Sequence, residues 1–204
     1  MSTSLDPSAG TPPADGACAQ CSRPLWAGES IESGGKWFCR DCYASLRAEL
    51  EAAIAGMSTE VNYPKAVAGA MVGGAAGALA WWGFTVLTHF AFGLFAVAIG
   101  HLAGRGAVLF SGGKRSRGLQ AVAIAAAVVS YAVATSLVNM TFINQAFASQ
   151  GEAFRVGFPP QSLGLFARVI SAGFGVMDIV FLAIAVWEAW RIPRPLSLPP
   201  GAGA

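Results

Sequence analysis

Residues 66–104 read AVAGAMVGGAAGALAWWGFTVLTHFAFGLFAVAIGHLAG and contain no Lys, Arg, Asp or Glu. About 20 apolar residues suffice for a helix to cross the hydrocarbon of a bilayer, so this stretch is about twice the length of one crossing. We therefore predict two transmembrane helices, residues 66–84 and 86–109, joined by a tight turn near Trp82-Gly83-Phe84-Thr85. Trp81 and Trp82 suit the aromatic belt of a membrane interface there.

Two further apolar segments, residues 119–143 and 166–190, have the same length and character. Polar stretches separate them: the basic turn SGGKRSRG at residues 111–118, and a loop at residues 144–162 that contains Glu152, Arg155 and Pro159-Pro160. The sequence thus predicts an all-α membrane protein in which residues 64–191 form four transmembrane helices.

Composition supports a membrane domain and argues against nucleic acid as a partner. Hydrophobic residues make up 54% of the chain and charged residues 12%, about half the charged share of an ordinary soluble domain. The formal net charge is only +2, and no basic patch is interleaved with aromatic residues.

The basic residues around the apolar segments predict the orientation. On this topology two arginines, Arg155 and Arg168, lie on one side of the membrane, and seven basic residues lie on the other: Lys65, Arg105, Lys114, Arg115, Arg117, Arg191 and Arg194. The positive-inside rule puts both termini in the cytoplasm, most simply of a bacterial inner membrane. The first 60 residues show no signal-peptide pattern. The glycine-rich turn at Lys114 sets topology or contacts anionic headgroups.

Four cysteines form two pairs, Cys18-x-x-Cys21 and Cys39-x-x-Cys42, with seventeen residues between the pairs. This spacing is typical of paired-cysteine zinc sites, and a reducing cytosol favours metal over disulfides. Four thiolates complete a tetrahedral shell and leave no position for a catalytic water. A redox dithiol needs no second pair. The pattern therefore favours a structural zinc ion in residues 18–42 over redox or catalytic roles.

The residues around these cysteines carry a resemblance. Cys18-Ala-Gln-Cys21-Ser-Arg-Pro-Leu, followed by Gly28-Glu29 and Gly35-Lys36-Trp37-Phe38-Cys39-Arg-Asp-Cys42, resembles one half of a LIM zinc finger and the B-box-type zinc ribbons of bacterial membrane proteins. LIM domains have two halves and usually a histidine where this chain has Cys39. The membrane region is similar to bacterial four-span proteins of unassigned function. The resemblance implies a zinc ribbon and no activity.

The segments that flank this zinc module differ in character. Residues 1–17 and 192–204 are rich in Pro, Gly, Ser and Ala, which predicts disordered tails. Residues 43–63 form an amphipathic linker helix, with one face that carries Leu46, Leu50, Ala53, Ile54 and Met57. Within the module, Trp26 and Trp37 either pack around the metal or remain exposed for a partner, and we expect packing.

Two features of the spans invite functional interpretation. Gly69, Gly73 and Gly77 recur every four residues and form a smooth helix face. This face serves either dimerisation or packing against another span of the same chain, and we expect the latter.

Ionisable residues inside a membrane are costly and indicate function by default. Here they are His101, Arg105, Asp178 and Glu188. We expect Asp178 midway along its span, where a pair with His101 or Arg105 would relay protons or bind a cation. The plainer interpretation, which we favour, is a structural tie between helices or a protonated Asp178 bonded to serine or Tyr131.

No catalytic motif is present: there is no Gly-x-Ser-x-Gly, no His-Glu-x-x-His and no phosphate-binding loop. We therefore expect a non-enzymatic integral membrane protein whose cytosolic zinc module contacts a protein partner, with homo-oligomerisation through the glycine face as a further prospect. The alternative is a small transporter or channel-like protein that uses Asp178 and His101. A membrane enzyme ranks third.

Overall fold

The fold is described from a computed structural model of the chain. It describes residues 16–26, 28–90, 93–151, 155–157, 162–172 and 175–198. These residues separate into two compact units, one within Met1–Met57 and Leu196–Ala204 and the other within Ser58–Pro195. The predicted tail 1–17 lies outside the described residues except for Gly16 and Ala17, as do residues 199–204 of the second tail.

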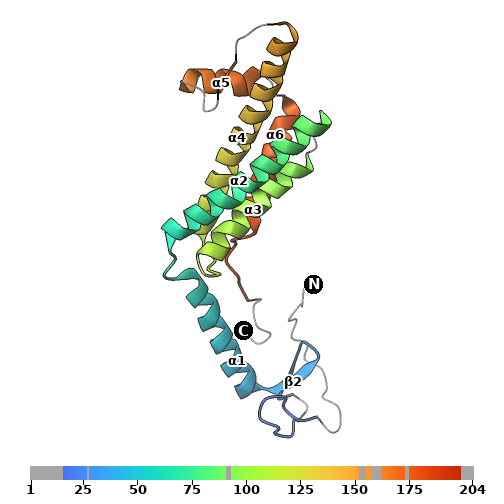
Figure 1. Cartoon of the computed structure of the whole chain (residues 1–204). Coiled ribbons are helices and arrows are strands. Elements are labelled where there is room, and N and C mark those ends of the chain that lie inside the picture. The colour runs from blue at the N-terminus through green and yellow to red at the C-terminus, as the bar shows by residue number, and fades with distance from the viewer. Residues whose placement is uncertain are drawn as a thin grey trace. The chain divides into compact units, whose positions relative to one another are not determined.

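The N-terminal unit consists of a hairpin followed by a helix (Figure 1). Strands β1 (Ser30–Ser33) and β2 (Lys36–Cys39) pair antiparallel, with Ser30 opposite Cys39. Gly34 and Gly35 have φ of 61° and 74°, the left-handed pair that a two-residue hairpin turn needs and that glycine adopts without strain. Helix α1 (Arg40–Ser58) starts directly after β2 and ends five residues before residue 63, the predicted end of the linker helix.

The described residues of the larger unit form five helices: α2 (Tyr63–Thr88), α3 (Leu94–Phe110), α4 (Arg117–Ser149), α5 (Leu163–Ala172) and α6 (Val176–Arg191). Four of them form a ring, in which α2 contacts α3 and α4, and α6 also contacts α3 and α4 (Figure 1). Helix α2 runs antiparallel to α3, because Gly69 faces Gly106 while Gly77 faces Ile99. Helix α5 packs on α4.

Side-chain caps define where the two longest helices begin. The Asn62 side chain accepts a hydrogen bond from the Lys65 backbone N–H at 3.1 Å, which caps α2, and Ser116 caps α4 by accepting from the Leu119 N–H at 3.2 Å. Each oxygen satisfies a backbone donor that has no partner within its own helix. Pro64 in the first turn of α2 suits the same boundary.

The predicted turn between the first two spans lies about two helical turns too early in the sequence. Helix α2 continues through Gly83 to Thr88 and ends at His89, whose φ of 56° is left-handed. The two tryptophans at this point contact α4. Trp81 is buried with its ring centroid 5.0 Å from that of Tyr131, and Trp82 Nε1 donates to Thr141 Oγ1 at 2.9 Å.

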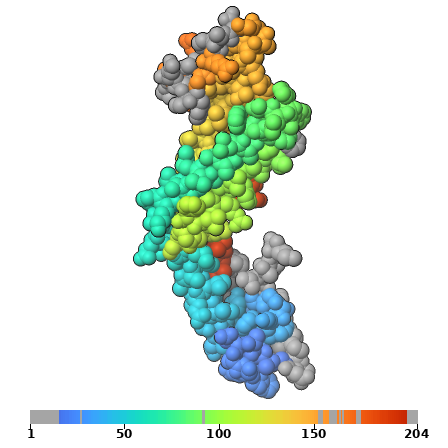
Figure 2. Space-filling model, viewed as in Figure 1, coloured from blue at the N-terminus to red at the C-terminus, as the bar shows by residue number. Residues whose placement is uncertain are grey.

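Small side chains make up most of the interior of the larger unit. One buried cluster consists of alanines apart from Leu119: Ala66, Ala70, Ala103, Ala107, Ala123, Ala126, Ala127 and Ala189. Large apolar side chains instead face outward, and Figure 2 shows the face formed by α2 and α3. Exposed examples on the four ring helices are Val72, Leu79, Leu109, Val129, Val176 and Trp187. This distribution differs from that of a typical soluble core, where Ile, Val, Leu and Phe share the interior with alanine.

The prediction of four transmembrane helices requires correction. Within the described part of the chain, two helices are long and apolar enough to cross a membrane, α2 and α4. Helix α3 has 17 residues, and the predicted fourth span at 166–190 is divided into α5 with 10 residues and α6 with 16. At about 1.5 Å per residue, α6 spans only about 24 Å.

Candidate metal centre

The first cysteine pair lies in a tight turn that its own backbone closes. The Cys18 N–H donates to the Arg23 carbonyl and the Ser22 N–H donates to the Cys18 carbonyl, both at 2.8 Å. Ser22 has a left-handed φ of 59°, which reverses the chain directly after Cys21. The turn is tied to the hairpin through Ala19, whose N–H donates to the Trp37 carbonyl at 2.9 Å.

The second pair spans the junction of β2 and α1. Cys39 is the last residue of the strand, and Cys42 lies in the first turn of the helix. The change from strand to helix turns both sulfur atoms toward the first pair. The Cys39 N–H donates to the Cys18 Sγ at 3.4 Å, a contact that joins the two pairs directly.

All four sulfur atoms lie within 4.8 Å of one another and can hold a metal ion. Cys21 Sγ and Cys39 Sγ are 3.9 Å apart, and all four cysteines are free thiols. Cys18 and Cys39 are buried beside Phe38, with Leu25 and Tyr43 packed against them. The structure thus brings together the residues that the sequence pattern selected.

The protonation of these thiols reflects their crowding. Burial raises the pKa of Cys18, but hydrogen bonds from the backbone N–H groups of Cys21, Cys39 and Gln20 lower it, and the net pKa is about 6. Hydrogen bonds with the Cys39 and Cys21 side chains, together with burial, raise the pKa of Cys42 to about 12. The Cys18 thiolate therefore forms readily, whereas Cys42 keeps its proton. A bound cation relieves this competition because it stabilises thiolates.

One expectation about the aromatic residues of the module is wrong. Trp37 is half-buried, but Trp26 is 69% exposed and does not pack around the cysteines. It is the most exposed large apolar side chain in the described part of the N-terminal unit. Packing of the cysteine cluster is completed by Phe38 and Leu25 instead.

The glycine face of the first span lies against α3 of the same chain. A Cβ at Gly69 would meet the Gly106 carbonyl oxygen, and one at Gly73 would meet that of Leu102. At Gly77 it would lie 2.8 Å from the Ile99 Cα. Only glycine allows the backbones to approach so closely.

Asp178 lies at the start of α6 and not midway along a span. Its Oδ2 accepts from the Gly175 backbone N–H at 2.8 Å, in a capping arrangement at the third residue of the helix. Its Oδ1 accepts from the Tyr131 hydroxyl at 3.2 Å. The carboxylate therefore stabilises the first turn of α6 and ties it to α4. The contact with Tyr131 is the helix tie that we favoured from the sequence, and the alternative pairing with His101 or Arg105 is not formed.

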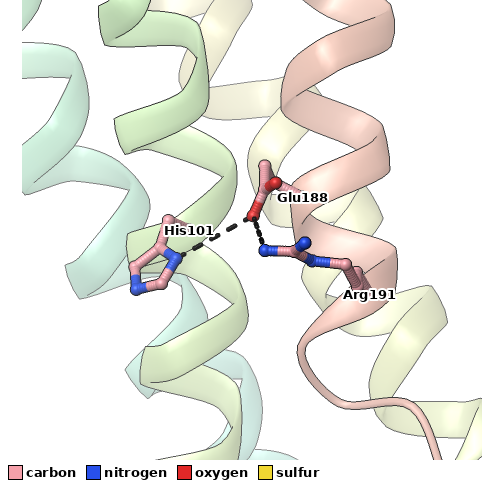
Figure 3. Close-up of polar contacts among 3 residues, drawn as sticks. All are labelled: His101, Glu188 and Arg191. Atoms are coloured by element: carbon pink, nitrogen blue, oxygen red, sulfur yellow. Dashed lines mark hydrogen bonds and ion pairs between the residues drawn. The ribbon is translucent and has the colours of Figure 1, made fainter. Parts of the chain in front are cut away.

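His101 instead lies opposite Glu188 (Figure 3). His101 Nδ1 on α3 is 3.9 Å from Glu188 Oε2 on α6, and Arg191 Nη2 lies 3.3 Å from the same oxygen. The Glu188 side chain is 14% exposed, and those of His101 and Arg191 are 46% and 60% exposed. Arg105 is exposed one helical turn further along α3. The cluster links the α3 and α6 helices and places a cationic side chain beside a mostly buried carboxylate.

Sequence reasoning missed one group of residues, at the end of the bundle where α4 begins and α6 ends. Gln120 Nε2 donates to the Trp190 carbonyl at 2.9 Å, and Arg194 stacks over the Trp190 ring at 5.2 Å. The signal was available, because Arg117, Gln120 and Ile124 recur at the three- and four-residue spacing of one helix face.

Comparisons with known proteins give no match: no protein-family model, no curated protein and no solved structure resembles this chain significantly. The likeness of residues 18–42 to half of a LIM finger therefore depends on the residues themselves, and the function is inferred from the geometry above.

Proposed function

We propose that this chain is a non-enzymatic integral membrane protein with a structural zinc module that recognises a cytosolic protein. The observation that carries the proposal is the closed set of four sulfur atoms within 4.8 Å. Four thiolates satisfy a tetrahedral metal completely, so the site offers no position for a substrate or an activated water.

Zinc is the metal that suits these donors best. A tetrahedron with metal–sulfur distances of about 2.3 Å has sulfur–sulfur edges of about 3.8 Å, and Cys21 Sγ and Cys39 Sγ are 3.9 Å apart. When bound, zinc would cross-link the two cysteine pairs and would supply no other chemistry. A unit of this size needs such a cross-link, because so few residues bury too little apolar surface to fold stably.

The larger unit is proposed to lie in a bilayer. Its alanine interior and its outward-facing Val, Leu and Trp side chains match helices that pack through small residues and present apolar surface to lipid. Helices α2 and α4 cross the membrane, and the shorter α3 and α6 complete a four-helix bundle within it. The seventeen residues of α3 meet the lower limit for a crossing.

The orientation follows from the end at which basic residues gather. The Tyr63 hydroxyl contacts Gly118, and Arg115 Nη1 donates to the Ile192 carbonyl at 2.7 Å. The start of α2, the turn before α4 and the end of α6 thus lie at one end of the bundle. We propose that this end faces the cytoplasm of a bacterial cell, which also keeps the cysteines reduced.

Partner recognition is assigned to the face of the zinc module that carries Trp26. An exposed tryptophan is a common anchor in protein interfaces, and Trp26 is 69% exposed while the cysteine cluster is packed without it. The transport alternative loses support, because Asp178 and His101 have separate partners.

Affinity purification from native membranes tests the proposal, with zinc content and co-purifying proteins read together. We compare the wild type with Cys39→Ser/Cys42→Ser and with Trp26→Ala. The double variant should lose zinc and partner, whereas Trp26→Ala should lose the partner and keep the zinc. If the wild type holds zinc but recovers no specific partner, the module has only a structural role. Ion flux in liposomes would then support the transporter alternative.

A further inference from the structure

A continuous groove runs between α4 and α6, starting at the basic end of the bundle. Its wider part has a volume of about 570 Å³ and is lined by Arg117, Gln120, Trp190 and Arg194, among others. A narrower part of about 360 Å³ is lined by Ile124, Ala183, Val186, Trp187 and Trp190. Ile124 and Trp190 line both parts, so the two hollows form one feature, called here the α4–α6 groove.

The wider part carries positive charge that the described residues do not neutralise. Arg117 starts α4 and Arg194 follows the end of α6, and both are exposed. Within the described ranges no carboxylate forms an ion pair with either guanidinium. The N-terminus of α4 adds the positive end of a helix dipole to the same region.

Hydrogen bonds hold the frame of this basic part. Gln120, only 8% exposed, donates from Nε2 to the Trp190 carbonyl at 2.9 Å. Trp190 in turn lies under Arg194, with the guanidinium carbon 5.2 Å from the ring centroid. The arginine is therefore positioned by the groove wall and is not a side chain that ranges freely over the surface.

The narrower part is apolar throughout. Helices α4 and α6 both line it, and from Arg117 to Ile124 the groove descends α4 by about 10 Å, at 1.5 Å per residue. Along this descent the lining changes from guanidinium to indole to aliphatic side chains. Trp187 and Trp190, whose ring centroids are 5.3 Å apart, form one wall.

We infer that the α4–α6 groove binds an anionic glycerophospholipid from the surrounding bilayer. Arg117 and Arg194 hold the phosphate, and an acyl chain lies against Ile124, Val186 and Trp187. A free phosphate would leave the apolar part empty. A zwitterionic lipid would offer the two arginines a phosphate whose charge its own headgroup cation offsets, whereas an anionic lipid brings a net negative charge. The assignment rests on the proposed function, because only a bundle in a membrane has this ligand at hand.

Native mass spectrometry of the full chain measures this selectivity directly. The protein is exchanged from detergent into mixed micelles with phosphatidylglycerol or with phosphatidylcholine of the same acyl chains. The test variant is Arg117→Gln/Arg194→Gln, and the matched control is Arg155→Gln/Arg168→Gln, which removes two exposed arginines from elsewhere in the larger unit. Ala183→Phe fills the apolar part and leaves the charges in place. Inorganic phosphate serves as the competitor.

We expect the wild type and the control to retain phosphatidylglycerol over phosphatidylcholine. The double variant at the groove should lose roughly 30-fold in retention of the anionic lipid, and Ala183→Phe should lower retention of both lipids. Excess phosphate should not displace the lipid.

Three results would overturn the inference: equal retention of the two lipids by the wild type, equal loss in the control, or displacement by phosphate alone. Carbonate extraction of native membranes separates this failure from failure of the proposed function. A chain that stays in the membrane but shows no selectivity rejects only the lipid site, whereas a chain that is extracted rejects the membrane assignment itself.

Discussion

The cysteine module and the helical bundle are both stabilised without a large hydrophobic core, but by opposite means. In the module the buried cluster is Cys18, Phe38 and Cys39, so two of its three members are themselves candidate metal ligands. In the bundle the buried residues are mostly alanines, and glycines let the helix backbones touch.

This difference predicts different responses to damage. The module depends on a few strong bonds at one point, so its loss should be complete once those bonds are broken. The bundle depends on many weak contacts along its length, so single changes should weaken it in proportion to the contact they disturb. The following experiments test this contrast, from the largest expected effect to the smallest.

Removal of the metal should unfold the module and leave the bundle intact. Structural zinc sites contribute about 10–16 kcal/mol to folding at neutral pH, which exceeds the total stability of most small domains. Hydrogen exchange after chelation should show lost amide protection in residues 16–57 and unchanged protection in α2–α6. If the module keeps its amide protection after metal analysis shows that the ion has gone, the prediction that the module depends on the metal is wrong.

In the bundle, Gly73→Ala should destabilise by about 2–3 kcal/mol, because its new methyl group meets the Leu102 carbonyl. The matched control is Gly83→Ala in the same helix, where a Cβ meets nothing within 4 Å. The control should be neutral or slightly stabilising. Thermal unfolding in detergent, followed by circular dichroism, compares the two variants, and similar losses in both would argue against close packing of α2 on α3.

Asp178→Ala should cost about 1 kcal/mol, because it removes the acceptor for the Gly175 N–H and for the Tyr131 hydroxyl. Tyr131→Phe should cost less, since it leaves the cap in place. A double-mutant cycle in the same unfolding assay should show coupling between the two. Proton or ion flux in liposomes that disappears in a folded Asp178→Asn variant would contradict the structural role.

Trp26→Ala should have the smallest effect on stability, within about 0.5 kcal/mol, because the side chain is 69% exposed. Metal content and unfolding of the module should match the wild type, while partner recovery falls. Trp37→Ala is the informative contrast, because Trp37 is half-buried and its loss should weaken the module itself. Equal destabilisation by both variants would remove the distinction between a docking and a packing tryptophan.

Prediction from the sequence was most accurate for residue types that have one dominant structural role. Cysteine spacing selected the four residues that the structure gathers within 4.8 Å, and the 3.6-residue period of Leu46, Leu50 and Met57 predicted α1. The polar turn before Arg117 marked the start of α4 correctly to within two residues.

Prediction failed where glycine and apolar residues have several uses. Gly83 was predicted to lie in a turn, but it lies inside α2. A Cβ at this position would have open space around it, so the helix does not require glycine there. The fourth apolar segment was predicted as one span because its hydropathy gives no sign that a helix ends and another begins before Val176. The Asp178 carboxylate was the available signal, since an acidic residue near the start of an apolar run favours a helix N-terminus. The exposure of Trp26 could not be predicted, because it depends on tertiary contacts that no local sequence pattern encodes.

The position of Cys42 has a consequence for helix α1 that goes beyond metal binding. The helix buries none of its residues, and an isolated helix of this length is marginal in water because its first turn is costly to nucleate. A metal held by Cys39 and Cys42 fixes that first turn at Arg40–Tyr43 and thus serves as the nucleus from which the remaining turns propagate. The length of this helix therefore depends on metal occupancy, and the helical content of residues 40–58 should increase as the ion is added.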